Sequence, residues 1–149
     1  MDEALLHRWQ SVPVAVVVDI DPKACQIDPN IRPLKPPGTQ PGLFGRAVTA
    51  KCQPPDFGSV LKAADAIKPG DVLVIDASGN SETAMIGEIV SGLVKRNGGV
   101  GLVCDGAIRD VAELSKWSDF SVFTRHITPC GPDSAGKFEL QLAVNIGGQ

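Results

Sequence analysis

Residues 99–110, GVGLVCDGAIRD, carry the pattern that decides the fold. The apolar run Val100–Cys104 is typical of a short buried strand. Asp105–Ile108 contains the turn dipeptide Asp-Gly and is expected to turn, and Arg109–Trp117 is expected to be helical. A strand that passes through a turn into a helix is the repeating unit of an α/β sheet, so this stretch predicts that class.

The segments on either side continue the alternation of strands and helices. Ser81–Asn97 is the clearest helix, because Met85, Ile89 and Leu93 recur every four residues along one face. The other expected elements are the strands Leu43–Cys52, Asp71–Asp76 and Phe120–Thr124 and the short helix Ser59–Ile67. This order of strands and helices indicates an α/β fold.

Two segments do not fit a single assignment. Val14–Ile20 has the density of β-branched residues that is typical of a strand, but Asp19 and the following Pro22 leave the assignment open. Phe138–Ile146 alternates like a strand close to the last residue. We expect one domain over residues 1–149, and it stays open whether its architecture is complete at the C-terminus.

The composition disfavours several classes of protein. With 43% hydrophobic and 21% charged residues, and 14 basic against 17 acidic side chains, neither disorder nor general polyanion binding is indicated. The longest apolar run, Val14–Val18, is far shorter than the roughly 20 residues of a membrane helix. Met1-Asp2-Glu3 lacks the basic region of a signal peptide. We therefore expect a soluble, cytoplasmic protein with no nucleic-acid or membrane partner.

Residues that commonly bind transition metals or act as nucleophiles are scarce. The four cysteines form no Cys-x-x-Cys pair, and the chain has two histidines. Reduced thiols are expected rather than a disulfide framework or a zinc site. With two histidines in the chain, a Ser-His-Asp triad is not favoured. Any catalysis is expected to depend on carboxylates, arginine and backbone groups.

The adjacent pair Arg109-Asp110 is the strongest candidate for chemistry. It follows a predicted strand, and ligands of α/β sheets bind at the carboxyl ends of strands. Glu88 precedes it, with 20 positions between Glu88 and Arg109. Structural explanations stay open, because Asp110 can stabilise a first helical turn and Arg109 can form a surface ion pair. Glu88 lies in an apolar helix face, where a buried carboxylate would require a partner.

These residues occur within motifs that resemble a known family. The motifs are VCDGAIRD (residues 103–110), Gly87-Glu88, FGRAVT (44–49), PGDVLVID (69–76) and Thr128-Pro129. Over roughly residues 14 to 148 they resemble the RraA-like family, which includes 4-hydroxy-4-methyl-2-oxoglutarate aldolases and a regulator of ribonuclease activity. An acidic residue, 20 positions and then Arg-Asp is the pattern of the aldolase branch.

The resemblance implies a fold and an assembly. The expected fold is a three-layered β/β/α arrangement of the swivelling-domain type, in homotrimers or hexamers with the active site near a subunit interface. The resemblance also implies a helix in Val14–Ala24. The sequence departs from the family in two places: a further Pro-Gly-Asp strand unit is absent after Gly147-Gly148, and Asp56-Phe57 stands where aldolases commonly carry Asp-Asn.

The resemblance also assigns roles to individual residues. Asp110 matches the aspartate that contacts Mg²⁺ or Mn²⁺, and one carboxylate completed by water suits a magnesium site. Arg109 matches the arginine placed against the substrate's keto oxygen and carboxylate, a role that suits a planar guanidinium. Glu88 matches an acidic residue that orients metal-bound water, although several aldolases carry aspartate there. The backbone amides of Gly87, Glu88, Ile89 and Val90 would hold the substrate carboxylate if a helix begins near Gly87.

Together these roles predict a metal-dependent class II pyruvate aldolase. Such an enzyme cleaves 4-hydroxy-2-oxo acids of the 4-hydroxy-4-methyl-2-oxoglutarate type to pyruvate. Oxaloacetate decarboxylation passes through the same enolate and is expected as a companion activity. The alternative is a noncatalytic member of the family that binds and inhibits an RNA-processing enzyme.

Overall fold

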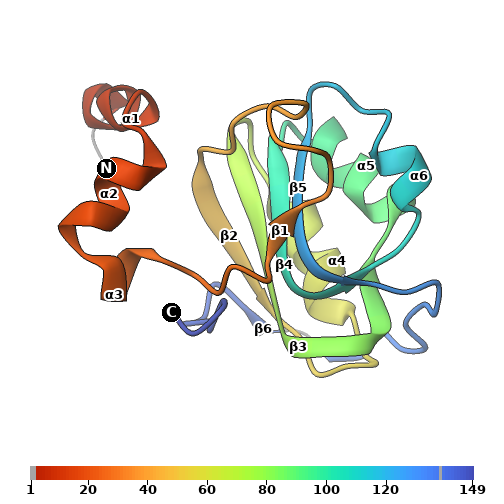
Figure 1. The fold of residues 1–149 in the computed structure, drawn as a ribbon. Helices are drawn as coiled ribbons and strands as arrows, with labels where there is room; N and C mark the ends of the chain where they lie inside the picture. The colour runs from red at the N-terminus through yellow and green to blue at the C-terminus, as the bar shows by residue number, and fades with distance from the viewer. Residues whose placement is uncertain (1–2, 138) are drawn as a thin grey trace.

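The fold is built around a mixed β-sheet with helices on one face (Figure 1). The computed structural model describes residues 3–137 and 139–149. The strands are β1 (Arg32–Pro33), β2 (Arg46–Lys51), β3 (Asp71–Ile86), β4 (Gly101–Ile108), β5 (Ser121–Ile127) and β6 (Glu139–Leu140), in the order β1-β5-β4-β3-β2-β6. Strands β2, β3, β4 and β5 are parallel to one another, whereas the short edge strands β1 and β6 pair antiparallel with β5 and β2. The predicted α/β class is confirmed.

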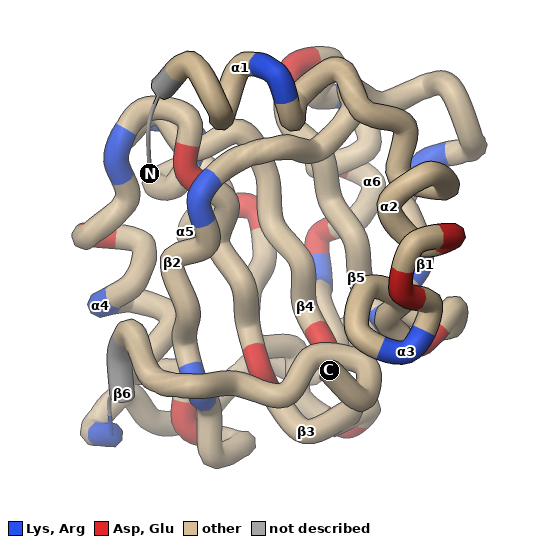
Figure 2. Tube along the Cα trace, turned by 90° about the vertical axis from the view of Figure 1, so that its left-hand side faces the viewer, with Lys and Arg blue, Asp and Glu red and all other residues tan. Residues whose placement is uncertain are grey.

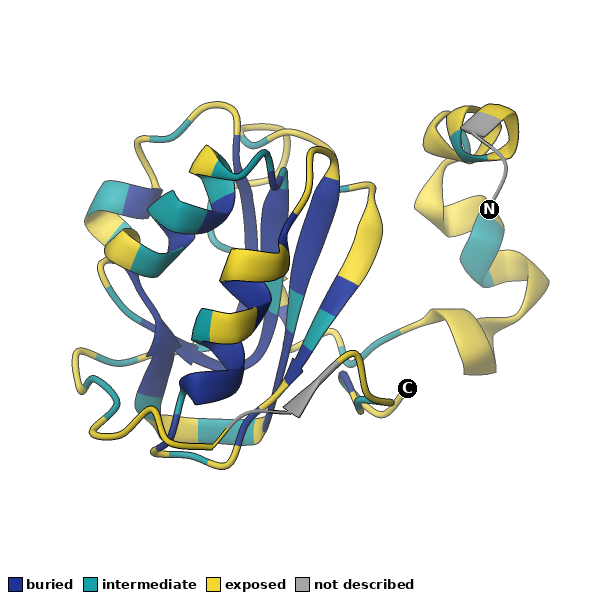
Figure 3. Ribbon diagram, turned by 180° about the vertical axis from the view of Figure 1, so that it is seen from behind, coloured by how far each residue is buried: buried dark blue, intermediate teal, exposed yellow. Residues whose placement is uncertain are grey.

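Three helices cover one face of the sheet and bury its aliphatic core. They are α4 (Gly58–Ala66), α5 (Glu88–Arg96) and α6 (Val111–Leu114), and Figure 3 shows that their inner surfaces are buried. Val60 and Val94 are fully buried on the inner sides of α4 and α5, in one cluster with Leu73, Ile75 and Leu102 of the sheet. Complete burial of such a side chain contributes about 1.5–3 kcal/mol, so the cluster holds the helices against the strands.

The N-terminal helices lie apart from the sheet (Figure 1). They are α1 (Glu3–Gln10), α2 (Val14–Ile20) and α3 (Pro22–Cys25), so the strand alternative for Val14–Ile20 is wrong and the helix implied by the resemblance is present. Pro22 has no N–H group to continue α2, so this helix ends before it. Asp21 is the N-cap of the next helix, α3, and its carboxylate accepts a hydrogen bond from the Ala24 N–H at 3.2 Å.

The prediction of one helix over Ser81–Asn97 is wrong for its first part. Strand β3 continues to Ile86, and α5 begins only at Glu88. The continuation of β3 pairs with β4 through register shifts, and Ala84 also donates its N–H to the Cys130 carbonyl at 2.8 Å. The four-residue spacing therefore runs from a strand into a helix, where Met85 is buried in the sheet and Ile89 is exposed on α5.

Two further predictions need correction. Asp105–Ile108 does not turn but forms the second half of β4, because Asp105 is held by partners on other segments and Gly106 packs closely against Ala77. Of Phe138–Ile146, only Glu139–Leu140 is a strand among the described residues, and Phe138 lies outside them.

The cysteines and the helices bear on two expectations from the composition, reduced thiols and the lack of a membrane helix. All four cysteines are free, as expected, and burial raises the pKa of Cys52 to about 12. In the part of the chain that the structure describes, no helix has the length and apolar character needed to cross a membrane.

Candidate functional site

The pair Arg109-Asp110 lies where β4 ends and α6 begins. The backbone N–H of Arg109 donates to the Ile86 carbonyl at 3.0 Å, which ties this point to the end of β3. Asp110 precedes α6 with φ of 58°, a left-handed conformation that aspartate tolerates better than most residues. Its carbonyl accepts hydrogen bonds from the N–H groups of Glu113 and Leu114, so the first turn of α6 fixes its backbone.

The two side chains form a loose pair with unused bonding capacity. Oδ2 of Asp110 accepts a hydrogen bond from the Glu88 N–H at 3.0 Å and lies 3.6 Å from Nε of Arg109. The Arg109 and Asp110 side chains are 41% and 40% exposed. Within the described residues, Oδ1 of Asp110 and the Nη groups of Arg109 make no hydrogen bond. Both groups can therefore bind a ligand without breaking the pair.

Gly87 and Gly131 lack side chains, and the side chains of Arg109 and Asp110 occupy the space this provides. A Cβ atom on Gly87 would collide with Oδ2 of Asp110 and would lie 2.8 Å from Cγ of Arg109. A Cβ atom on Gly131 would collide with Nη1 of Arg109. A side chain at either position would displace the guanidinium or the carboxylate.

The pair opens onto a cavity of about 350 Å³. The cavity is lined by Phe57, Leu61, Ala84, Met85, Ile86, Gly87, Ile89, Val90, Arg109, Asp110 and Pro132. Helix α5 begins here with Gly87 as its N-cap, and the first N–H groups of a helix have no acceptor within it. The cavity is polar only where Arg109, Asp110 and these backbone groups meet.

The structure brings together most of the residues that the sequence indicated. Gly87, Ile89, Val90, Arg109 and Asp110 all line the cavity, and α5 begins at Glu88, which meets the condition for the role of the backbone amides near Gly87.

Glu88 differs from the other predicted residues. Its backbone N–H binds Asp110, but its side chain is exposed and does not line the cavity. Glu88 begins α5 on an exposed surface, beside the exposed Ile89, so its carboxylate needs no buried partner.

Several lining residues were not identified from the sequence. Phe57 and Leu61 come from the start of α4, and Pro132 comes from the loop after β5. They are ordinary apolar residues, and their role depends on packing between segments far apart in the chain. No local signal marks Leu61 and Pro132, whereas the family resemblance singles out Phe57, which stands where aldolases commonly carry asparagine.

The side chains near the pair that could bind a divalent metal are few. Within residues 3–137 and 139–149, no group of three or more His, Cys, Asp and Glu side chains is arranged to hold an ion. A cage made entirely of such side chains is therefore absent from this part of the chain. Magnesium also binds through one or two carboxylates with water and substrate oxygens in the other positions, and the exposed Asp110 carboxylate fits that mode.

Comparisons with known proteins agree on one family. Residues 14–149 match the model of the RraA-like family, described as Aldolase/RraA. A protein from Halalkalibacterium halodurans named "Putative 4-hydroxy-4-methyl-2-oxoglutarate aldolase" is 32% identical over 143 residues. The match covers 96% of this chain, and the chain spans 66% of that relative's length. A protein of the same name from Azotobacter vinelandii is 31% identical over 134 residues, covering 87% of this chain and 82% of the relative.

A solved structure shares the fold. The RNA-processing inhibitor RraA from Thermus thermophilis superimposes with a TM-score of 0.79 at 23% identity, covering 93% of this chain and 82% of the other. This likeness confirms the fold that the resemblance implied.

Proposed function

This chain belongs to the RraA-like family, and from that premise we propose that it is a lyase that releases pyruvate from 4-hydroxy-2-oxo acids. In this proposal it is a class II pyruvate aldolase that uses Mg²⁺ or Mn²⁺. The names of the relatives make 4-hydroxy-4-methyl-2-oxoglutarate the first substrate to test. Oxaloacetate decarboxylation is proposed as a second activity.

The loose Arg109–Asp110 pair at the mouth of a cavity carries the proposal. A 2-oxo acid has a carboxylate and an adjacent keto oxygen. The Glu88 N–H donates to Asp110, and the following N–H groups in the first turn of α5 can bind the carboxylate, as helix N-termini bind anions. The Arg109 guanidinium can donate to the keto oxygen, and its 41% exposed side chain leaves room for that contact.

Asp110 is the residue that would hold the divalent cation. When bound, the cation would act as a Lewis acid that polarises the keto oxygen. The Glu88 N–H fixes one carboxylate oxygen of Asp110 at 3.0 Å, which leaves the other oxygen for the cation. Glu88 is proposed to orient the surrounding water through its exposed carboxylate.

The cleavage places negative charge next to Arg109. The C4 hydroxyl loses its proton, and its oxygen becomes the carbonyl of the leaving aldehyde or ketone. The C3–C4 bond breaks and its electron pair forms the enolate of pyruvate, which takes a proton at C3. In oxaloacetate the same enolate forms as carbon dioxide leaves. A positioned cationic group such as Arg109 stabilises charge that develops in the transition state.

A pyruvate assay tests this function. Purified protein is incubated with 4-hydroxy-4-methyl-2-oxoglutarate or oxaloacetate, with Mg²⁺ or Mn²⁺ and with or without a chelator, and pyruvate is measured with lactate dehydrogenase. We expect pyruvate from both compounds and its loss with the chelator. No pyruvate from either compound with either metal would refute the proposal.

A noncatalytic regulator is the second candidate. The observation that favours it is the set of exposed apolar side chains on α1 and α2, including Trp9, Val14 and Ile20, which offer a surface for a protein partner. An RNA-processing enzyme inhibited in stoichiometric complex, together with no metal-dependent turnover, would support it. We also propose assembly into trimers or hexamers, which light scattering after size-exclusion chromatography would test.

A further inference from the structure

The outer end of the Arg109 side chain is only weakly held within its own pair. Its Nε atom lies 3.6 Å from Oδ2 of Asp110, which is too long for a good hydrogen bond, and within the described residues its Nη groups make none. A long side chain that is free to rotate loses conformational entropy when it is fixed in one position. Contacts from other segments are therefore needed to set where the guanidinium points.

The loop after β5 supplies such a contact. A Cβ atom on Gly131 of this loop would collide with Nη1 of Arg109 and would lie 3.1 Å from its Cζ. The backbone of Gly131 therefore packs directly against the guanidinium. The next residue, Pro132, lines the same cavity as Arg109. The position of this part of the loop limits where the guanidinium can lie.

Two anchors hold the loop, one on each side of Gly131. Before it, the Cys130 carbonyl accepts the Ala84 N–H at 2.8 Å, which ties the loop to β3. After it, the Ser134 carbonyl accepts the Phe57 N–H at 3.0 Å, which ties the loop to the start of α4. Residues 131–133 lie between these anchors, so a shift of either anchor moves Gly131.

The Asp56 carboxylate strengthens the second anchor. Its Oδ2 accepts the Ser134 hydroxyl and the Gly136 N–H, each at 2.8 Å, and the Lys137 N–H lies 3.2 Å from both oxygens. Its Oδ1 also accepts the Gly58 N–H at 2.9 Å, at the first residue of α4. Asp56 is 5% exposed, and hydrogen bonds to an ionised acceptor are stronger than those between neutral groups. One buried carboxylate thus holds the end of the loop against α4.

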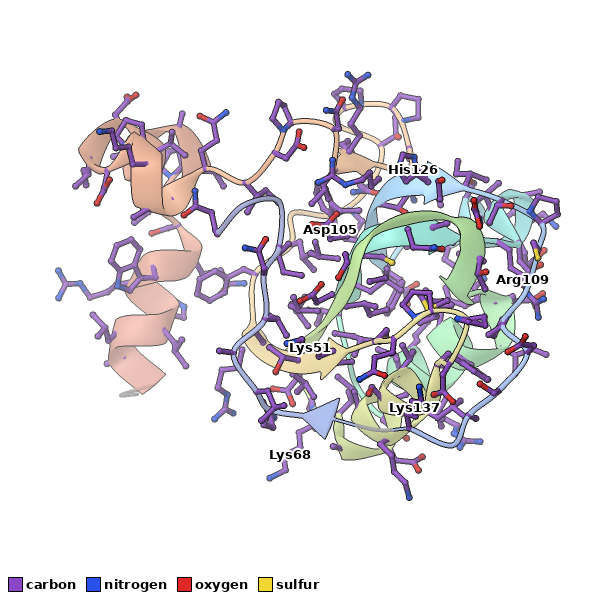
Figure 4. The ribbon with its side chains drawn as sticks, turned by 90° about the horizontal axis from the view of Figure 1, so that it is seen from below. Lys51, Lys68, Asp105, Arg109, His126 and Lys137 are labelled. Atoms are coloured by element: carbon purple, nitrogen blue, oxygen red, sulfur yellow. The ribbon has the colours of Figure 1, made fainter. Side chains whose placement is uncertain are left out.

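Asp56 does not reach the site itself. It is not among the residues that line the cavity, and Figure 4 shows Lys137, whose N–H binds Asp56, well apart from Arg109. An effect of Asp56 on the guanidinium therefore passes through the loop.

We propose that Asp56 is a positioning residue, which acts through the loop after β5 to hold the Arg109 guanidinium at the cavity. The inference rests on the proposed function for what Arg109 does, whereas the link from Asp56 to Arg109 is a property of the fold. While the carboxylate binds its donors, Gly131 stays against Nη1 of Arg109. Without them the loop gains freedom, and the guanidinium loses its alignment with the keto oxygen of the substrate.

Asp56→Asn tests the link in two backgrounds. Asparagine has a similar size but one acceptor oxygen, and its amide group faces N–H donors of the loop, so the loop should loosen. In the parent, kcat/KM for pyruvate release per folded molecule should fall about tenfold, chiefly through kcat, because the first turn of α5 still binds the substrate carboxylate. In Arg109→Ala, the same substitution should change kcat/KM by less than about twofold. An equal loss in both backgrounds, or no loss in the parent, would overturn the inference.

A spectroscopic measurement follows the guanidinium without any substrate. In proton–nitrogen NMR spectra of the arginine side chains, the Nε–H signal of Arg109 is identified by its loss in Arg109→Ala. In Asp56→Asn this signal should shift and its heteronuclear NOE should decrease, because the side chain becomes more mobile. An unchanged signal would overturn the inference. If the parent releases no pyruvate, the proposed function fails, and the spectrum still decides whether Asp56 holds the guanidinium.

Ser134→Ala tests the same link with a milder change. It removes one donor from the Asp56 carboxylate at an exposed position of the loop, so the fold should be retained. We expect the same shift of the Arg109 signal and a loss of about threefold in kcat/KM, in line with one hydrogen bond. An unchanged signal in a folded Ser134→Ala variant would contradict the inference even if Asp56→Asn failed to fold.

Asp71→Asn is the matched control for the loss of a buried carboxylate. Asp71 is also 5% exposed and accepts the Lys68 N–H at 2.9 Å, but it begins β3 and does not line the cavity. The Arg109 signal and the turnover per folded molecule should stay as in the parent. Changes as large as those of Asp56→Asn would mean that any buried substitution disturbs the site, and would overturn the specific role of Asp56.

Discussion

Two arginine–carboxylate groups in this molecule use the same chemistry with different geometry. Arg125 donates from Nε to Asp105 at 2.5 Å and from Nη1 to Asp28 at 2.6 Å. The Arg125 and Asp105 side chains are 16% and 7% exposed. Arg109 and Asp110 are 3.6 Å apart and each about two fifths exposed. Figure 4 shows Arg109 well apart from Asp105.

The Arg125 group is satisfied within the protein. The other oxygen of Asp105 accepts the Gly147 N–H at 2.6 Å, and Asp76 beside it on β3 accepts the Asn145 N–H at 3.0 Å. Figure 2 shows the C-terminal segment crossing the strands here, beside acidic positions. The hydrogen bonds to Asp105 and then Asp28 raise the pKa of Arg125.

The difference indicates which group is available to a ligand. The Arg125 group also borders a cavity, of about 780 Å³, but its charges already have short, shielded partners. The Arg109–Asp110 pair has free donors and acceptors beside an apolar wall. We infer that the satisfied group stabilises the fold and that the loose pair serves binding and chemistry.

The largest effect should come from removing the loose pair. Arg109→Ala and Asp110→Asn should each lower kcat/KM by about 10²–10³-fold, because each removes a group that faces developing charge. Their free energies of unfolding should stay within about 0.5 kcal/mol of the parent, since both side chains are exposed. Pyruvate assays and urea titrations check the two parts. Retained activity in either variant would remove that residue from the mechanism.

The satisfied group should show the opposite response. Arg125→Met leaves the buried Asp105 carboxylate without its cation and should lower the free energy of unfolding by about 3 kcal/mol. Turnover per folded molecule should persist. Arg46→Met is the matched control, because Arg46 is 67% exposed and lies 3.9 Å from Asp71, so its loss should change little. Equal stability of the two variants would contradict the comparison.

Displacing the loose pair without removing it should have a smaller effect. Gly87→Ala places a Cβ against Asp110 and Arg109, and a displacement of about 1 Å in such a site can cost about 10²-fold in kcat/KM. Gly92→Ala is the control within α5, since its nearest contact would be an ordinary 3.8 Å to Trp117. A variant of Gly87 with full activity would show that the geometry of the pair is not critical.

The sequence predicted the loose pair better than the satisfied group. Arg109 and Asp110 are adjacent, and the strand before them is strongly apolar, so local pattern placed them at a strand end. Asp105 was assigned to a turn because its dipeptide favours one. Its partners Arg125 and Gly147 lie 20 and 42 residues away, and local sequence gives no sign of them.

The boundary between β3 and α5 shows the same limit. Met85 and Ile89 fit one helical face, yet Met85 is buried in the sheet and Ile89 is 82% exposed on a helix. The apolar spacing is the same in both interpretations, and only pairing with β4 distinguishes them. The same reason left Leu61 unidentified, because its position at the cavity depends on how α4 packs.

Asp56 sharpens the comparison, because it is a satisfied carboxylate without a cation. The Gly58 N–H at 2.9 Å is the chief cause that lowers the pKa of Asp56 to about 2, and hydrogen bonds from Ser134, Gly136 and Lys137 assist against the opposing effect of burial. The folded-state pKa lies below the ordinary value of 3.8, so the ionised group stabilises the fold above about pH 4. That contribution is lost as the pH falls toward 2.

Asp56→Asn should therefore have a pH-dependent and smaller effect than Arg125→Met. Asparagine keeps one acceptor oxygen, and no buried charge is left unpaired. In urea titrations between pH 7 and pH 3, the parent should be more stable at pH 7, and the difference should shrink on acidification. Asp65→Asn, on the exposed side of α4, should show no such trend. A difference that is independent of pH would mean that the shape of the side chain, rather than its charge, holds the loop that carries Pro132 to the cavity.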